Sequence, residues 1–344
     1  MNVKVWWAGA AMLALSPLSA AVAQAAEVKA VASFTILADV VSEVGGDRVE
    51  VSSLIGTNGD PHAYEPTPSD VRRVRDADVV FMSGLGLEGW MDRLITTSGF
   101  KDSPVVVSKN IHTREMGEDD EHGHDDEHGH DHGHDGEDDH GHDHGGEKGH
   151  AHDDGHGHGG GHHHHHDGPD PHVWNSPANV EVWVDNIVAA LSKADPDGAD
   201  EYRANGDAYK QALESLDNDA RTQIDAIPED KRRILTSHDA FGYFGDRYGV
   251  TFLSPLGMTT DSEASARDVA GLITQMKEEH IGSYFFENSN DPRLVEQIAN
   301  AAGAEPGGEL YVEALSDADG PAATYIDMFR FNVDQMVSAM KKND

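Results

Sequence analysis

The sequence predicts an α/β protein with two βα lobes, mainly parallel sheets and one long helix that joins the lobes. Short apolar runs typical of strands alternate with segments in which apolar residues recur at helical spacing, as expected for parallel βαβ units. This alternation occurs twice, over residues 28–107 and 233–302. Between the two regions, a continuous helical periodicity predicts a helix of roughly 25 residues, about 38 Å long.

The first residues have the pattern of a secretory signal peptide. Lys4 is the only charged side chain before Glu27, an apolar run follows over residues 5–18, and Ala23-Gln24-Ala25 offers small residues for cleavage. The apolar run is too short to span a membrane, and no later segment has about 18 uninterrupted apolar residues. We therefore expect a signal peptide at residues 1–25 and an exported, soluble mature chain without membrane insertion.

The N-terminal lobe is assigned to residues 26–196. Its predicted strands are residues 28–34, 49–55, 78–82 and 105–107. Its predicted helices cover residues 36–44, 68–74, 87–95 and 184–191. Gly45-Gly46 ends the first of these helices, because glycine is common where a helix stops.

The bridging helix is assigned to residues 197–228. Its apolar side chains, from Tyr202 to Ile227, recur at spacings of three, four or seven residues, and Pro228 ends the pattern. The C-terminal lobe is assigned to residues 229–344. Its predicted strands are 233–237, 250–253 and 283–287, and its predicted helices are 240–248, 264–280, 292–302 and 323–340.

The composition restricts the chemistry. The 344 residues carry 25 Lys and Arg against 63 Asp and Glu, a net charge of −38. Such an acidic chain lacks the basic face that nucleic acids or anionic lipids require, and its charge favours a soluble monomer. The absence of cysteine removes disulfides, thiolate metal sites and iron–sulfur clusters. Any transition metal must therefore be held by His and carboxylate side chains.

A low-complexity insert at residues 117–168 consists of Gly, His, Asp and Glu except for Lys148 and Ala151. Such a segment cannot bury a core, so we expect it to be disordered without metal. We consider three roles: a low-affinity zinc collector, a sensor that buffers excess zinc, and a solvated spacer. Its 18 histidines are candidate low-affinity metal ligands: His122, His124, His128, His130, His132, His134, His140, His142, His144, His150, His152, His156, His158, His162, His163, His164, His165 and His166.

Three of the five histidines outside the insert occupy similar settings. His62 and His172 each follow an Asp-Pro pair in a loop, and His238 follows a strand. Proline restricts the local backbone, and ligands of α/β proteins gather beyond the carboxyl ends of strands. We interpret His112 and His280 as surface residues.

The segments around these three histidines carry a family resemblance. Residues 60–70 (DPHAYEPTPSD), 170–174 (DPHVW) and 237–244 (SHDAFGYF) resemble the three metal-ligand motifs of ZnuA-type, cluster A-I solute-binding proteins of ABC importers. The resemblance covers nearly the whole mature chain. It implies two lobes with one metal in the cleft between them, and a periplasmic location.

The resemblance also implies the ligands. His62 and His172 would come from the N-terminal lobe and His238 from the C-terminal lobe. A fourth, carboxylate ligand would come from the segment 310–315, in which Glu313 stands where relatives often have Asp. Water, Asp317 or Glu287 are alternatives to Glu313. Glu65, Asp239 and Asn175 are candidates for hydrogen bonds that orient the imidazoles, chosen because they lie near the motifs.

Three imidazoles and one carboxylate form a ligand set that suits zinc, whereas manganese prefers more oxygen ligands. Relatives that carry manganese usually have a carboxylate where His238 stands. We therefore expect high-affinity capture of Zn²⁺ and its delivery to an ABC permease, with a periplasmic zinc chaperone as a further candidate partner.

Three other functions are considered. The first is manganese binding by a member of the same family, and the second is zinc storage in which only the insert matters. The third is a zinc hydrolase with Glu313 as base. The chain has neither H-E-x-x-H nor G-x-S-x-G, which disfavours an enzyme. Because one long helix is a stiff hinge, we expect loop ordering on metal binding rather than wide closure.

Overall fold

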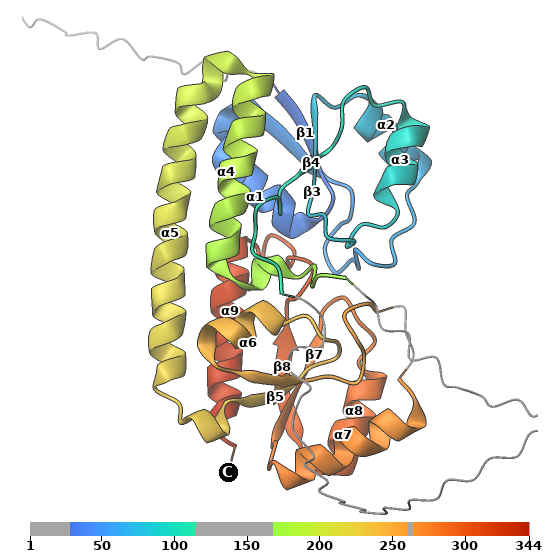
Figure 1. Ribbon diagram of the computed structural model, residues 1–344, viewed down its shortest axis with the longest axis vertical. Helices are drawn as coiled ribbons and strands as arrows, with labels where there is room; N and C mark the ends of the chain where they lie inside the picture. Colours follow the sequence, from blue (N-terminus) through green and yellow to red (C-terminus); the bar gives the residue numbers. More distant parts are fainter. Residues whose placement is uncertain (1–27, 115–167, 261–263, 344) are drawn as a thin grey trace, which may run out of the picture.

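The structure is a computed structural model that describes residues 28–114, 168–260 and 264–343 (Figure 1). The predicted signal peptide at residues 1–25 and the 18 histidines of the insert lie outside the described residues. Among the residues described, no helix combines the length and apolar composition needed to cross a membrane.

The N-terminal lobe contains a four-stranded parallel sheet with the order β2-β1-β3-β4. The strands are β1 (Val28–Ala32), β2 (Val49–Ser53), β3 (Val79–Met82) and β4 (Val105–Val106). In Figure 1, α1 and α4 lie on one side of this sheet and α2 and α3 on the other. These helices are α1 (Thr35–Gly45), α2 (Pro68–Arg75), α3 (Met91–Ser98) and α4 (Pro177–Ala194).

The C-terminal lobe repeats this topology in a second parallel sheet with the order β6-β5-β7-β8. Its strands are β5 (Arg233–Leu235), β6 (Thr251–Leu253), β7 (Ser283–Glu287) and β8 (Glu305–Leu310). Its helices are α6 (Gly242–Tyr248), α7 (Ala266–Glu278), α8 (Arg293–Ala302) and α9 (Tyr325–Met340). Short 3₁₀ turns are η1 (Gly46–Arg48), η2 (Val173–Asn175), η3 (Pro196–Gly198) and η4 (Glu229–Lys231). The predicted fold class, with two parallel βα lobes, is confirmed.

Strand β8 was not predicted, because its sequence EPGGEL is poor in residues that favour strands. The packing requires its glycines. A Cβ atom on Gly307 would lie 2.5 Å from the ring of Phe285, and Gly308 has a φ of +130°. The register between β7 and β8 shifts at Tyr284 and Phe285, next to these glycines. Tertiary contact with β7 therefore overrides the local preference.

The long helix α5 (Ala199–Asp225) runs along both lobes, as predicted (Figure 1). It packs against α1 and α4 of the N-terminal lobe and against α6 and α9 of the C-terminal lobe. Gly206 allows α4 and α5 to approach closely, since a Cβ atom there would lie 2.7 Å from Val188.

One hydrophobic core extends through both lobes. It includes Val40 of α1, Leu213 of α5, Phe244 of α6 and Phe329 of α9. A second, smaller cluster, which includes Met276 and Ile298, packs α7 and α8 against the C-terminal sheet. The lobes therefore share buried side chains and are not joined by a linker alone. Limited domain motion on metal binding stays a prediction.

Polar contacts also join the lobes. The Trp174 indole donates a hydrogen bond to the carbonyl of Val312 (2.7 Å), and the Tyr325 hydroxyl donates to the carbonyl of Trp174 (2.8 Å). Asp39 of α1 accepts a hydrogen bond from the backbone N–H of Tyr325 (2.8 Å) at the start of α9. Asp39 thus satisfies one of the free amides at that helix N-terminus.

We expect Asp39→Asn to change the pH dependence of stability. Burial raises the pKa of Asp39 to about 6, and the negative charges of Glu43 and Asp327 act in the same direction. The hydrogen bond from the backbone of Tyr325 acts in the opposite direction and lowers this pKa. At Asp39 the folded chain therefore binds a proton more tightly than the unfolded chain. The contribution of Asp39 to the free energy of unfolding consequently falls as the pH rises from about 4 to about 6. Asn keeps an acceptor without this penalty.

Urea unfolding in EDTA at several pH values measures the effect. The stability of Asp39→Asn relative to wild type should rise by about 2 kcal/mol from pH 4 to pH 7. The exposed control Asp47→Asn should stay parallel to wild type. A constant difference between Asp39→Asn and wild type would contradict the prediction.

Candidate metal centre

The candidate ligands come from loops of both lobes. His62 lies in the loop between β2 and α2, and His172 immediately precedes η2. His238 follows β5, and Glu313 follows β8. Three of the four positions therefore lie beyond the carboxyl end of a strand, which is the usual place for ligands in parallel sheets.

The two Asp-Pro-His motifs form the same local turn. Asp60 Oδ1 accepts a hydrogen bond from the backbone N–H of His62 (2.7 Å), and Asp170 Oδ1 accepts one from that of His172 (2.9 Å). An aspartate that accepts from the backbone two residues later stabilises a tight turn. The other oxygen of Asp60 accepts from Thr260 Oγ1 of the C-terminal lobe (2.6 Å). Local sequence thus orients these two histidines.

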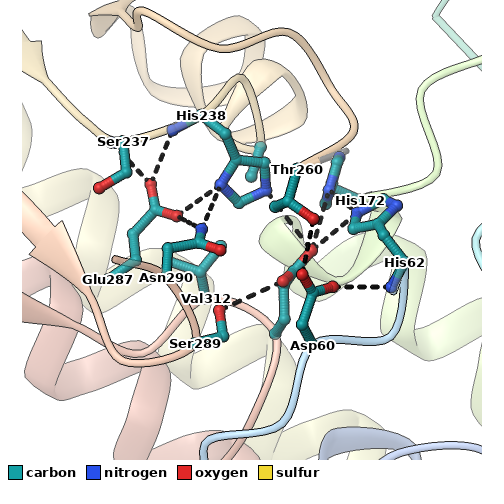
Figure 2. Close-up of polar contacts among 12 residues, drawn as sticks. Asp60, His62, His172, Ser237, His238, Thr260, Glu287, Ser289, Asn290 and Val312 are labelled. Atoms are coloured by element: carbon teal, nitrogen blue, oxygen red, sulfur yellow. Dashed lines mark hydrogen bonds and ion pairs between the residues drawn. The ribbon is translucent and has the colours of Figure 1, made fainter. Parts of the chain in front are cut away.

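The four side chains predicted as ligands come together, with their ligand atoms within 4.8 Å of one another. The three histidines among them are labelled in Figure 2. Glu313 Oε1 lies 2.7 Å from His62 Nε2, 3.5 Å from His172 Nε2 and 3.4 Å from His238 Nε2. Glu313, His172 and His238 are completely buried, and the His62 side chain is 4% exposed. In the described part of the chain, this is the cluster of metal-ligand side chains that meets such a spacing.

Two inward atoms lack hydrogen-bond partners within the described protein, namely His238 Nε2 and Glu313 Oε1. They lie 3.4 Å apart without the alignment of a hydrogen bond. Buried polar atoms are normally satisfied, so these two need a partner between them. A cation coordinated by nitrogen and oxygen fits this requirement.

The carboxylate partners determine which imidazole nitrogens face inward. Glu287 accepts hydrogen bonds from His238 Nδ1 and from the backbone N–H groups of Ser237 (2.9 Å) and His238 (3.1 Å). Asp170 accepts one from His172 Nδ1 (2.9 Å). Because Nδ1 carries the proton in these contacts, Nε2 of each neutral imidazole offers its lone pair to the cluster.

The charges of the cluster are mutually dependent. Burial disfavours ionised Glu313, but His238 and His172 hold its pKa well below the usual range. Burial also disfavours protonated His238, but Glu287 and Glu313 raise its pKa well above the usual value. The pKa of His172 is raised by Asp170 and Glu313, again against burial. A metal must therefore displace protons from the cluster, and its affinity must fall as the pH decreases.

The three residues proposed to orient the imidazoles have other surroundings. Glu65 is exposed. Asn175 donates to the carbonyl of Ala240 (2.8 Å), two residues after His238 in the chain. Burial and the charge of Asp170 raise the pKa of Asp239, and its backbone N–H donates to Leu256. No hydrogen bond described in the structure joins these three side chains to an imidazole of the cluster.

Asp170 and Glu287 instead contact the imidazoles, and sequence reasoning had not assigned them this role. The role of Asp170 could have been predicted from the sequence, because Asp170 and Asp60 each stand two residues before a histidine in an Asp-Pro-His motif. Glu287 was considered only as an alternative ligand, and Asp317 likewise. Asp317 accepts from Thr57 Oγ1 (2.9 Å), and neither carboxylate belongs to the four-residue cluster. His112 and His280 are exposed and lie outside it.

The fold and the site together define a bilobed binding protein whose lobes form a site suited to a metal cation. A family model described as the periplasmic component A of a zinc-uptake complex matches residues 30–339. The chain belongs to this ZnuA family of extracytoplasmic metal-binding proteins of ABC transporters. Members of this family are the substrate-binding components of transporters and are not enzymes.

Similar proteins carry names with different metals. The manganese-binding lipoprotein MntA of Halalkalibacterium halodurans is 31% identical over 314 residues, 91% of this chain and 89% of that protein. The iron-binding protein YfeA of Yersinia pestis is 28% identical, over 89% of this chain and 84% of its own.

Solved structures show the same fold. The periplasmic zinc-binding protein TroA of Treponema pallidum has a TM-score of 0.74 and 26% identity, covering 91% of this chain and 99% of its own. The manganese-bound periplasmic metal-binding protein of Candidatus Liberibacter asiaticus has a TM-score of 0.70 and 25% identity, with the same coverage. The likenesses therefore support a metal-binding function, and the names of these relatives include manganese, iron and zinc.

We expect Glu287→Gln to weaken metal binding by about 10–100-fold, as is typical when the carboxylate behind a metal-bound imidazole is lost. The glutamine can still accept from the backbone, but its neutral amide favours neither the orientation nor the basicity of His238. Competition with a chromophoric chelator measures the affinity. Glu65→Gln is the matched control and should bind like wild type. Equal affinities of Glu287→Gln and wild type would show that Glu287 does not support His238.

Proposed function

We propose that this protein captures Zn²⁺ with high affinity between its two lobes and delivers it to an ABC permease. The observation that carries the proposal is the convergence of three imidazole nitrogens and one carboxylate oxygen in a buried cluster. His62, His172, His238 and Glu313 are the proposed ligands. Binding by loops of both lobes gives a permease a way to distinguish the loaded from the empty protein.

The donor set supports zinc. Zinc in proteins is usually four-coordinate with nitrogen, sulfur or oxygen donors, and Zn–N bonds of about 2.0–2.1 Å fit a tight cluster of imidazoles. Manganese prefers a set richer in oxygen. His238 gives this site its third nitrogen, and its Nε2 has no hydrogen-bond partner within the described protein.

Manganese is the second candidate cargo, because relatives at 31% and 30% identity are named as manganese-binding lipoproteins. Direct comparison of Zn²⁺ and Mn²⁺ affinities decides between the two metals. A role restricted to zinc storage in the insert is less well supported, because it leaves the buried four-residue cluster without a function.

The insert is proposed to collect zinc at lower affinity near the cleft. Its flanking residues support a location close to the cluster. The backbone N–H of Asp170 donates to the carbonyl of Arg114 (3.2 Å), so the two flanks of the insert meet. Asp170 in turn contacts His172. Both ends of the insert therefore lie near the proposed ligand His172.

We expect His238→Ala to abolish the tight zinc site. Removing a ligand should lower affinity by more than the about 10–100-fold caused by loss of an outer partner. Zinc titration against a chromophoric chelator, with His112→Ala as an exposed histidine control, measures the loss. The control should retain one tight zinc ion. Retention of that ion by His238→Ala would refute the proposed site.

Deletion of residues 117–168 should remove the weak zinc sites and leave one tight site of unchanged affinity. The reason is that the four proposed ligands all lie in the described fold outside this segment. Isothermal titration at increasing zinc concentration separates the two classes of site. A Gly/Ser segment of equal length in place of the insert controls for chain length. Loss of the tight site on deletion would contradict a two-site arrangement.

A further inference from the structure

The segment Glu287–Asn290, at the end of β7 and before α8, contacts both residues that the C-terminal lobe contributes to the cluster. Glu287 accepts a hydrogen bond from His238 Nδ1 (Figure 2). Ser289 Oγ donates a hydrogen bond to Glu313 Oε2 at 3.2 Å. Each contact reaches the side of the ligand that faces away from the cluster centre. The segment thus contacts both proposed ligands through atoms that are not directed to the cluster centre.

The two oxygens of Glu313 have different surroundings. Oε1 faces the three imidazoles, at 2.7–3.5 Å from their Nε2 atoms, and has no hydrogen-bond partner among the residues described. Oε2 instead accepts from the hydroxyl of Ser289. One oxygen is therefore directed to the centre of the cluster, and the other is engaged outside it.

Asn288 restrains the backbone on both sides of Glu313. Its Oδ1 accepts from the N–H of Val312 (3.2 Å), and its Nδ2 donates to the carbonyl of Ala314 (3.2 Å). The carboxylate cannot easily turn to present both oxygens inward while these contacts and the Ser289 contact persist. The segment therefore restrains both the position and the orientation of Glu313.

We propose that Ser289 determines metal specificity by making Glu313 a ligand that coordinates through one oxygen only. The inference rests on the proposed function, in which the cluster binds Zn²⁺. Coordination through Oε1 alone gives three nitrogens and one oxygen, the closed four-coordinate set that zinc prefers. Coordination through both oxygens would add the further oxygen donor that favours manganese. Ser289 thus disfavours manganese without touching the metal.

The test compares wild type with Ser289→Ala, Ser289→Thr and the control Thr274→Ala, all in the full chain. Thr274 is exposed on α7 of the same lobe, and its hydroxyl bonds only within that helix. Zn²⁺ and Mn²⁺ affinities are measured by competition with a chelator. Co²⁺ replaces zinc as a spectroscopic probe, because four-coordinate Co²⁺ absorbs visible light much more strongly than five- or six-coordinate Co²⁺.

We expect Ser289→Ala to lower the ratio of zinc to manganese affinity by about tenfold, the effect of one hydrogen bond to a charged group. Its Co²⁺ absorption should weaken as Glu313 supplies both oxygens. Ser289→Thr keeps a hydroxyl and should restore the ratio and the spectrum, and Thr274→Ala should match wild type in both.

Unchanged ratio and spectrum in Ser289→Ala would overturn the inference. An equal loss of affinity for both metals would also overturn it, because that result indicates a merely structural role. A wild type that binds zinc tightly but gives a five- or six-coordinate Co²⁺ spectrum overturns the inference and leaves the proposed function intact. A wild type without a tight zinc site overturns the proposed function and the inference together.

Discussion

The carboxylate of Glu313 is fully buried, and an ionised carboxylate in such surroundings is strongly disfavoured unless charged or hydrogen-bonding groups surround it. Three imidazoles provide these groups, and they come from segments far apart in the chain. The shared core, α5 and the contacts of Trp174 bring the two lobes together so that the imidazoles can reach Glu313. The same proximity of nitrogen and oxygen atoms makes the cluster suitable for a metal.

The lobes have the same strand order, but they position their ligands in different ways. In the N-terminal lobe, each histidine is oriented by the aspartate two residues before it, within one turn. In the C-terminal lobe, Glu287 and Ser289 orient His238 and Glu313 across 49 and 24 residues of sequence. Local turns therefore define one half of the site, and tertiary contacts define the other half.

This difference explains what the sequence could predict. Periodicity predicted α5, and the Asp-Pro-His motifs predicted His62 and His172, because both depend on interactions within a few residues. Strand β8 was missed, because its glycines are needed for contact with Phe285 and not for strand formation. Glu65, Asp239 and Asn175 were chosen for nearness in sequence, but the carboxylate that accepts from His238 Nδ1 is Glu287, at the end of β7. Such a contact follows from the packing of the lobe.

The hydrogen bond between Asp170 and Arg114 closes the fold at the base of the histidine-rich segment. The free energy needed to bring the ends of a chain segment together rises slowly with its length, by about 0.6 kcal/mol for each doubling. A change in the number of residues between Arg114 and Asp170 is therefore expected to alter the free energy of folding little. The four residues of the buried cluster all lie outside this segment, so such changes leave their side chains in place.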